Sequence, residues 1–415
     1  MSVFSVFNDR KKRKKNTETP TVEQYYEKRA RRVSHVRYTC LLLTVLFVVY
    51  GFLVHGEELT TDNFRYMLKF LDLGEVEVTD ADAELRFDYA ESNRGGLYLG
   101  DLVVLNTDGL TVYSRDAGTA GDKLFSESFR MEDPRLAVTP KYIFAYDLGG
   151  SDVRVFNSHS QFARLSMDYP IYGFSAGENG YFAVITAEKN YRTAVYVYDS
   201  HARQVYKRLL SNTYMDQISL SPDGQSFLAL GHEAGDGYLQ TLLQVYSIKK
   251  EQPTMSLTFR GELPLMASYT RDGRFAVLTS TALRFYDGKS DTPVQVYSME
   301  NRSLSGCTFS DGNLLLSAEE SGLAGDDLLW VYDSKGELLG ETSFHGKAAY
   351  TVLRNDVLYL LNSDTLTVLP LSGEAVTYRT RGDALQVLFD LDGTPIIFEK
   401  NTAYRLTDTQ KEDTQ

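Results

Sequence analysis

The feature that most constrains the fold of this chain is a strand motif that recurs along residues 74–407. Each copy is an apolar segment of period two that ends in an aromatic residue and runs into a turn. Six clear copies are LTVYS at 110–114, VRVFN at 153–157, AVYVYD at 194–199, LLQVYS at 242–247, LRFYD at 283–287 and LLWVYD at 328–333; weaker ones lie at 366–370 and 402–406. Their spacing of about 36–50 residues is the length of one four-stranded propeller blade.

Each copy is the second strand of a hairpin, often introduced by an Asp-Gly turn such as SPDG at 221–224. A third strand follows every hairpin except the last, and a short apolar inner strand then leads into the next copy. Eight inner strands, starting with 85–89, and eight hairpins are present, but only seven outer strands follow them. We expect 75–79 to supply the eighth and close the ring, which leaves no open sheet edge. The predicted fold is therefore all-β, a β-propeller of eight blades, with seven as the alternative.

The SPDG turn and the VYD strand endings resemble those of WD40-like and TolB-like propellers. The whole plan is similar to a family of bacterial single-pass membrane proteins of unknown function: a basic tail, an apolar helix, a short capped helix and a divergent extracytoplasmic propeller. The resemblance implies a propeller fold and an extracytoplasmic location at the membrane. It carries no catalytic residue to this chain.

An apolar run without formal charge covers residues 38–56, and 19 residues of helix span about 28 Å, close to the thickness of a bilayer core. We predict one transmembrane helix there, in contact with membrane lipid; a buried core helix and a cleaved signal peptide are the alternatives. Residues 1–37 carry 11 Lys and Arg against four acids. Basic flanks stay in the cytoplasm, so residues 57–415 are expected outside a bacterial cell membrane.

The large segment after this run has its own predicted parts. Residues 57–73 read as a juxtamembrane amphipathic helix, with Phe64, Met67, Leu68 and Leu71 at helical spacing. Residues 74–407 form the propeller, and 408–415 a polar tail. Residues 38–415 carry a net charge of −20, which argues against nucleic acid as a partner. The two cysteines, Cys40 and Cys307, do not make a disulfide framework.

Several short matches to functional motifs have simpler interpretations. Gly173–Gly177 fits the nucleophile-elbow pattern, but no helix is predicted after it, and a blade turn is favoured. Asp80, Asp82 and Glu84, and likewise Asp390, Asp392 and Gly393, alternate as in a calcium loop but lack its distal glutamate. The Arg381–Asp383 tripeptide matches an adhesion motif that a blade loop explains. The spacing of the six histidines does not match that of a zinc site; these are His35, His55, His159, His201, His232 and His345.

The chain contains 28 tyrosines, which suit either a sugar-stacking surface or blade packing, and their place at hairpin ends favours packing. No catalytic, cofactor-binding or metal-ligating residue is predicted. We expect a non-enzymatic binding or scaffolding module for a protein or a cell-wall polymer. The alternatives are an enzyme with its site at the channel mouth and a receptor that couples to a cytoplasmic partner.

Overall fold

The computed structural model describes residues 37–46, 84–115, 121–157, 160–235, 237–319, 326–345, 347–362, 364–382 and 384–406. The chain divides into two units, Met1–Glu75 and Val76–Gln415. In the first unit residues 37–46 form a helix. Among the described stretches, no helix has both the length and the apolar character that crossing a membrane requires. Residues 1–36 of the basic tail, the remainder of 38–56, the predicted helix at 57–73 and the polar end lie outside the described residues.

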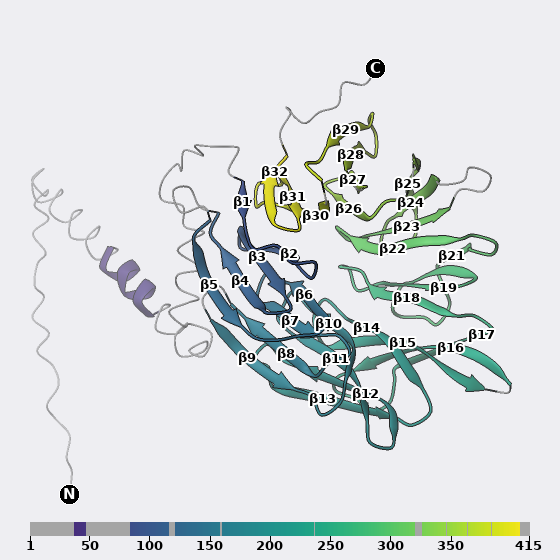
Figure 1. Cartoon of the computed structure of the whole chain (residues 1–415). Helices are drawn as coiled ribbons and strands as arrows, with labels where there is room; N and C mark the ends of the chain where they lie inside the picture. The colour runs from purple at the N-terminus through teal and green to yellow at the C-terminus, as the bar shows by residue number, and fades with distance from the viewer. Residues whose placement is uncertain are drawn as a thin grey trace, which may run out of the picture. The chain divides into compact units, whose positions relative to one another are not determined.

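The second unit consists of eight four-stranded sheets, which are the blades of a propeller (Figure 1). The strands of blades one to four are β2 (Arg94–Tyr98), β3 (Asp101–Asn106), β4 (Gly109–Tyr113) and β5 (Lys123–Ser128); β6 (Pro134–Val138), β7 (Ile143–Asp147), β8 (Asp152–Phe156) and β9 (Gln161–Ser166); β10 (Ile171–Ala176), β11 (Phe182–Glu188), β12 (Tyr191–Tyr198) and β13 (Gln204–Leu210); and β14 (Tyr214–Leu220), β15 (Ser226–Gly235), β16 (Tyr238–Ser247) and β17 (Met255–Arg260).

The strands of blades five to eight follow the same order. They are β18 (Pro264–Tyr269), β19 (Phe275–Thr279), β20 (Ala282–Tyr286) and β21 (Gln295–Ser298); β22 (Leu304–Ser310), β23 (Asn313–Glu319), β24 (Asp326–Tyr332) and β25 (Leu338–His345); β26 (Tyr350–Arg354), β27 (Val357–Leu361), β28 (Thr365–Pro370) and β29 (Val376–Arg379); and β30 (Ala384–Phe389), β31 (Pro395–Glu399) and β32 (Thr402–Arg405), completed by β1 (Leu85–Arg86).

Within each blade the strands are antiparallel, and the first of them lies nearest the centre of the ring (Figure 1). The second strands read as nearly continuous apolar runs because both of their faces are covered by neighbouring blades: every residue of β19 is buried. The outer strands alternate between exposed and half-buried residues, as β17 does. The predicted eight-blade propeller is confirmed, and the seven-blade alternative is wrong.

The strand that closes the ring is not the one predicted. The fourth strand of blade eight is β1, in which Leu85 pairs with Ala403, whereas 75–79 lies outside the described residues. The inner strand of blade one is consequently β2 and not 85–89. The prediction failed because Gly95 and Gly96 disfavour a strand by propensity. Packing demands them there: a Cβ at Gly95 would lie 2.5 Å from the Phe398 ring.

Charged side chains tie the two ends of the ring together. Asp390 of blade eight accepts from Arg115 of blade one at 3.0 Å and also from Arg405. All three side chains are largely buried. Burial pushes the Asp390 pKa up, but the two arginines and a backbone N–H outweigh it and hold the pKa below its usual range. Arg381 donates to Glu84, next to β1, and lies 4.3 Å above the Tyr404 ring.

Candidate docking surface

The serine of the elbow-like segment belongs to an inner strand. Ser175 lies in β10, and its hydroxyl accepts a hydrogen bond from Leu220 N at 3.1 Å, which joins blade three to blade four. The element after β10 is the antiparallel strand β11. Because a nucleophile elbow needs a strand–turn–helix, Ser175 has a packing role here.

The described residues of the calcium-like and adhesion-like motifs form ion pairs where blade eight closes the ring. Glu84 and Arg381 bind each other, and Asp390 holds Arg115 and Arg405. Asp80, Asp82 and Asp383 lie outside the described residues. Within the described part of the chain, no group of three or more His, Cys, Asp or Glu is placed to hold a metal ion.

The tyrosines at the ends of the third strands are core residues, as predicted. Tyr198, Tyr246, Tyr286 and Tyr332 are all buried. Tyr286 stacks on Phe275 of the preceding strand with ring centroids 4.9 Å apart. Burial raises the pKa of Tyr198, Tyr286 and Tyr332 to about 12. These tyrosines therefore stay neutral and pack the blades together.

Other tyrosines and leucines are exposed, and they gather on one side of blades three to five. We call upper the side that carries the hairpins between second and third strands and the connections between blades. Seven large apolar side chains that are 37–70% exposed lie at its strand ends and turns, and we call them the docking surface: Tyr172, Tyr191, Tyr214, Tyr238, Leu239, Leu263 and Leu265.

Contacts between the blades make this surface continuous. Arg192 of β12 donates to the hydroxyl of Tyr214 in β14, and its guanidinium lies 4.9 Å from that ring. Gln217 of β14 donates to Leu265 O of blade five at 2.5 Å. Gly261 N donates to Leu239 O at 3.2 Å, which fixes the connection between blades four and five to the long β15–β16 hairpin.

A β-bulge places an acid beside a histidine within the surface. The register of β14 against β15 shifts between Met215 and Gln217, so Asp216 is the extra residue. Its Oδ2 lies 2.8 Å from Nδ1 of His232, whose ring stacks on Tyr214 with centroids 5.4 Å apart. The two side chains are 42% and 34% exposed. Because both side chains are partly exposed, the pair can bind a polar group of a partner.

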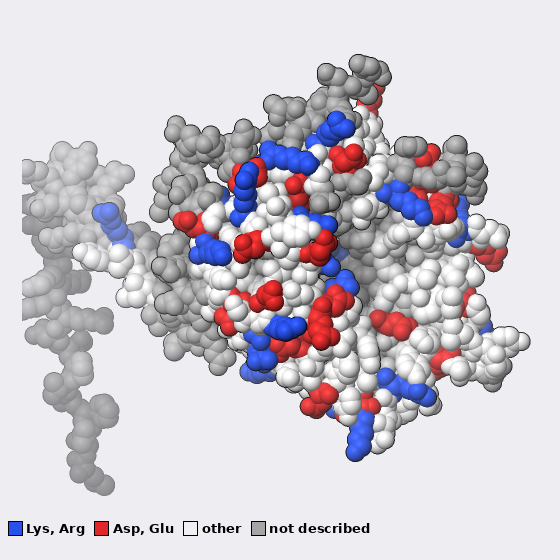
Figure 2. Space-filling model, viewed as in Figure 1, with Lys and Arg blue, Asp and Glu red and all other residues white. Residues whose placement is uncertain are grey.

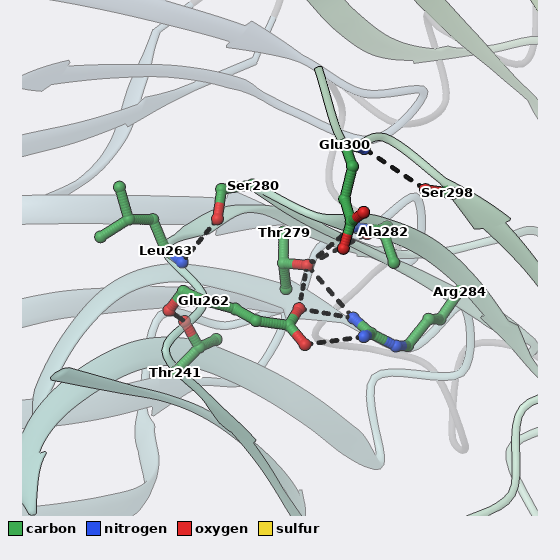
Figure 3. A network of polar contacts seen from close by, with 9 residues as sticks. All are labelled: Thr241, Glu262, Leu263, Thr279, Ser280, Ala282, Arg284, Ser298 and Glu300. Carbon is green, nitrogen blue, oxygen red and sulfur yellow. Dashed lines mark hydrogen bonds and ion pairs between the residues drawn. The ribbon is translucent and has the colours of Figure 1, made fainter. Parts of the chain in front are cut away.

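A buried ion pair holds the backbone that presents the leucines (Figure 3). Arg284 donates to both carboxylate oxygens of Glu262 at 2.8 Å, which is the bidentate geometry of a strong guanidinium–carboxylate pair. Thr279 also donates to this carboxylate. Thr241 donates to Glu262 O at 2.5 Å, and Ser280 accepts from Leu263 N at 3.0 Å. Residues 262 and 263 are thus fixed on both sides, while the Leu263 side chain is 51% exposed.

The charge of Glu262 is stabilised in this position. Burial alone would raise its pKa, but hydrogen bonds from Arg284, Thr279 and Thr281 outweigh that effect and leave the pKa below its ordinary value. The Arg284 guanidinium also lies 4.5 Å from the Phe259 ring. The carboxylate is fully used within the protein, so we assign Glu262 a positioning role.

Figure 2 shows acidic and basic side chains interspersed on the visible face of the propeller, without a large region of one sign. This distribution does not favour a polyanion such as nucleic acid as the ligand of that face.

One feature of the sequence points to the docking surface, although it matches no functional motif. Strands β15 and β16 have ten residues each, and the last two pairs of this hairpin, Ala234 with Leu239 and Gly235 with Tyr238, extend beyond the sheet. The side chains of Tyr238 and Leu239 lie at the tip of this hairpin, are exposed and are not needed for the core. The other members were hidden because they sit at strand ends whose orientation depends on the whole ring.

Solved structures with this fold include two of low sequence identity. The C-terminal WD40 domain of Sif2 matches with a TM-score of 0.55 at 11% identity, over 80% of this chain and all of that one. A structure titled as the eukaryotic initiation factor matches with a TM-score of 0.51 at 11% identity, over 78% of this chain and 89% of that one. At this identity the likeness concerns the fold alone.

No curated protein matches the sequence. One family model does match, over residues 83–402, and its description is a family of unknown function, DUF5711. This range begins just before the closing strand β1 and ends in the last strand, β32, so it covers the propeller. The chain belongs to the DUF5711 family.

Proposed function

We propose that this protein is a non-enzymatic docking module: a propeller, anchored in a bacterial cell membrane by residues 38–56 and facing away from the cytoplasm, that binds a protein partner through the docking surface. The observation that carries the proposal is the set of exposed apolar side chains on blades three to five. Exposed apolar patches on a protein surface mark sites of interaction with other molecules. Tyrosine in particular combines a large apolar ring with a polar end and is enriched at protein interfaces.

The rigidity of the surface supports the proposal. Leu263 follows a residue held by the bidentate Glu262–Arg284 pair, and Leu239 belongs to a paired strand end. A binding group that is already ordered loses less conformational freedom when a partner arrives. The surface is therefore suited to bind without rearrangement.

The anchor and its direction rest on the sequence. The uncharged run at 38–56 is long enough for a bilayer, and the excess of basic residues before it places the tail inside the cell. In this arrangement residues 38–56 hold the outward-facing propeller at the membrane, and the tail of about 37 residues lies in the cytoplasm.

The test is co-purification of the full-length protein from its own membranes with two double variants. Leu263→Glu with Leu265→Glu places charges in the docking surface, and we expect at least about a tenfold loss of the bound partner, as at an interface hot spot. Val294→Glu with Val296→Glu is the matched control, because both valines are exposed and lie around the outer strand of blade five. Equal partner recovery with both double variants would contradict the proposal.

A further inference from the structure

A buried carboxylate that lacks part of its expected surroundings lies at the upper end of blade six. Asp327 belongs to β24 and is only 3% exposed. Its Oδ2 accepts a hydrogen bond from Ser305 at 2.9 Å, whereas its Oδ1 is buried and has no hydrogen-bond partner. Burial of a charge is costly unless that charge is both paired and hydrogen-bonded. The free Oδ1 therefore indicates that Asp327 has a further ligand.

Blade five contains a comparable carboxylate that is fully paired. Glu262 there receives two hydrogen bonds from Arg284 (Figure 3). In contrast, no Lys, Arg or His of the described part of the chain forms an ion pair with Asp327. The charge of Lys347 interacts with Asp327 over a longer distance, but this ammonium group is paired with Glu319 at 2.6 Å. The charge of Asp327 is thus left without a counter-charge of its own.

Two serine hydroxyls and a main-chain carbonyl bring further oxygen atoms to this carboxylate. Ser305 is the extra residue of a β-bulge, because the register of β22 against β23 shifts between Leu304 and Gly306. Its hydroxyl lies 2.9 Å from Asp327 Oδ2 and 3.0 Å from the hydroxyl of Ser317. The Ser317 hydroxyl in turn lies 3.5 Å from Gly306 O. A row of oxygen atoms therefore crosses β22, β23 and β24.

This row of oxygen atoms begins at the surface of the protein. Ser305 and Gly306 are exposed, while Ser317 and Asp327 are buried. A Cβ added at Gly306 would lie 2.9 Å from the Ser317 hydroxyl and, apart from its chain neighbours, would meet no other atom within 4 Å. The missing side chain at position 306 thus leaves the approach to Ser317 open.

We propose that Asp327, Ser305 and Ser317 bind a monovalent metal cation. Carboxylate, hydroxyl and carbonyl oxygen atoms are the ligands that hard cations take, and a single carboxylate balances one positive charge. The site lies in blade six, outside the docking surface, so it does not depend on the proposed function. The ligand set includes none of the neighbouring groups outside the described part of the chain, which are residues 320–325, the side chain of His345 and Gly346.

The experiment follows the melting temperature of the detergent-solubilised full-length protein while sodium chloride replaces choline chloride at constant ionic strength. We expect a rise of about 2 °C in sodium, because a ligand that binds only the folded state stabilises that state. Asp327→Asn should abolish the sodium dependence, and Ser305→Ala, at an exposed position, should weaken it. Glu319→Gln is the control and should keep it, since Glu319 is the cross-strand neighbour of Asp327 and is already paired with Lys347.

Several results would overturn the inference. One is a melting temperature of the natural protein that does not depend on sodium, which leaves an internal water as the partner of Oδ1. Another is stabilisation by calcium chloride and not by sodium chloride, which contradicts a monovalent ion. A sodium dependence that persists in Asp327→Asn, or that is lost in Glu319→Gln, would place the effect elsewhere. If Asp327→Asn does not fold, an unchanged sodium dependence in Ser305→Ala overturns the inference in its place.

Discussion

Single polar contacts decide how the docking surface is held, and Glu262 is the clearest case. Glu262→Gln removes the charge that balances Arg284, whose side chain is only 16% exposed. We expect the free energy of unfolding of the detergent-solubilised protein to fall by about 1–3 kcal/mol in urea, because a buried charge loses its counter-charge. Glu178→Gln is the control: that side chain is 67% exposed, and its loss should stay within about 0.5 kcal/mol.

The same residue predicts a dependence on pH. The folded-state pKa of Glu262 lies below its ordinary value of 4.5, so its contribution to stability is complete above about that pH. It is lost as the pH falls through the lower folded-state value, where the carboxylate takes up a proton. The difference in stability between the natural protein and Glu262→Gln should be constant from pH 6 to 8 and shrink below pH 4.5. A difference that grows on acidification would contradict the assignment.

At the scale of the element, strand identity could be predicted well and strand pairing at the seam could not. The predicted strand copy at 242–247 ends with β16 at Ser247, and the copy at 283–287 is displaced from β20 by one residue. Local alternation of apolar residues contains that information. The closing strand pairs Leu85 with Ala403, more than 300 residues away. The identity of the inner strand of blade one depends on Gly95 and Gly96, whose lack of a side chain is explained by the neighbouring Phe398 and Val138 side chains.

The closing strand makes a specific prediction about truncation. A chain that begins at residue 82 keeps β1, whose Leu85 is buried and whose neighbour Phe87 stacks on Phe398 at 5.3 Å. A chain that begins at residue 88 loses both contacts and exposes the edge of β32. We expect the first to melt cooperatively as a monomer, like a chain that begins at residue 73, and the second to melt lower and associate. Equal melting of all three would show that β1 is dispensable.

At the scale of the whole molecule, the sequence predicts the cellular location and the eight-bladed propeller. The docking surface, in contrast, is defined only by the assembled propeller. Its members come from five strands and one connection, with no motif in common. These exposed apolar side chains lie together because each is at the upper end of a strand or in an upper connection, and that position depends on the closure of eight blades. For this reason no sequence motif predicts these residues as a site, although the blades themselves can be predicted from the strand pattern.

The proposed orientation can be tested on intact cells. A membrane-impermeant thiol reagent should label single cysteines introduced after Glu58 and spare those introduced at Lys11–Lys15. Arginine at Leu43 and Val48 should impair insertion, since a charge at the centre of a membrane helix costs about 2.5–3.5 kcal/mol on insertion scales. Labelling of the tail from outside would reverse the topology and remove the propeller from the wall space.

The most direct test of the central claim is a map of partner contacts around the whole propeller. A photo-reactive residue replaces, one at a time, Tyr172, Tyr238 and Leu263 of the docking surface. The control positions are Leu391, in the turn between β30 and β31 on the side opposite to the upper one, and Val296, in the outer strand of blade five. All five side chains are exposed. The account predicts one partner protein cross-linked from the first three positions and from neither of the others. Adducts with that partner from Leu391 or Val296, without any from the docking surface, would contradict it.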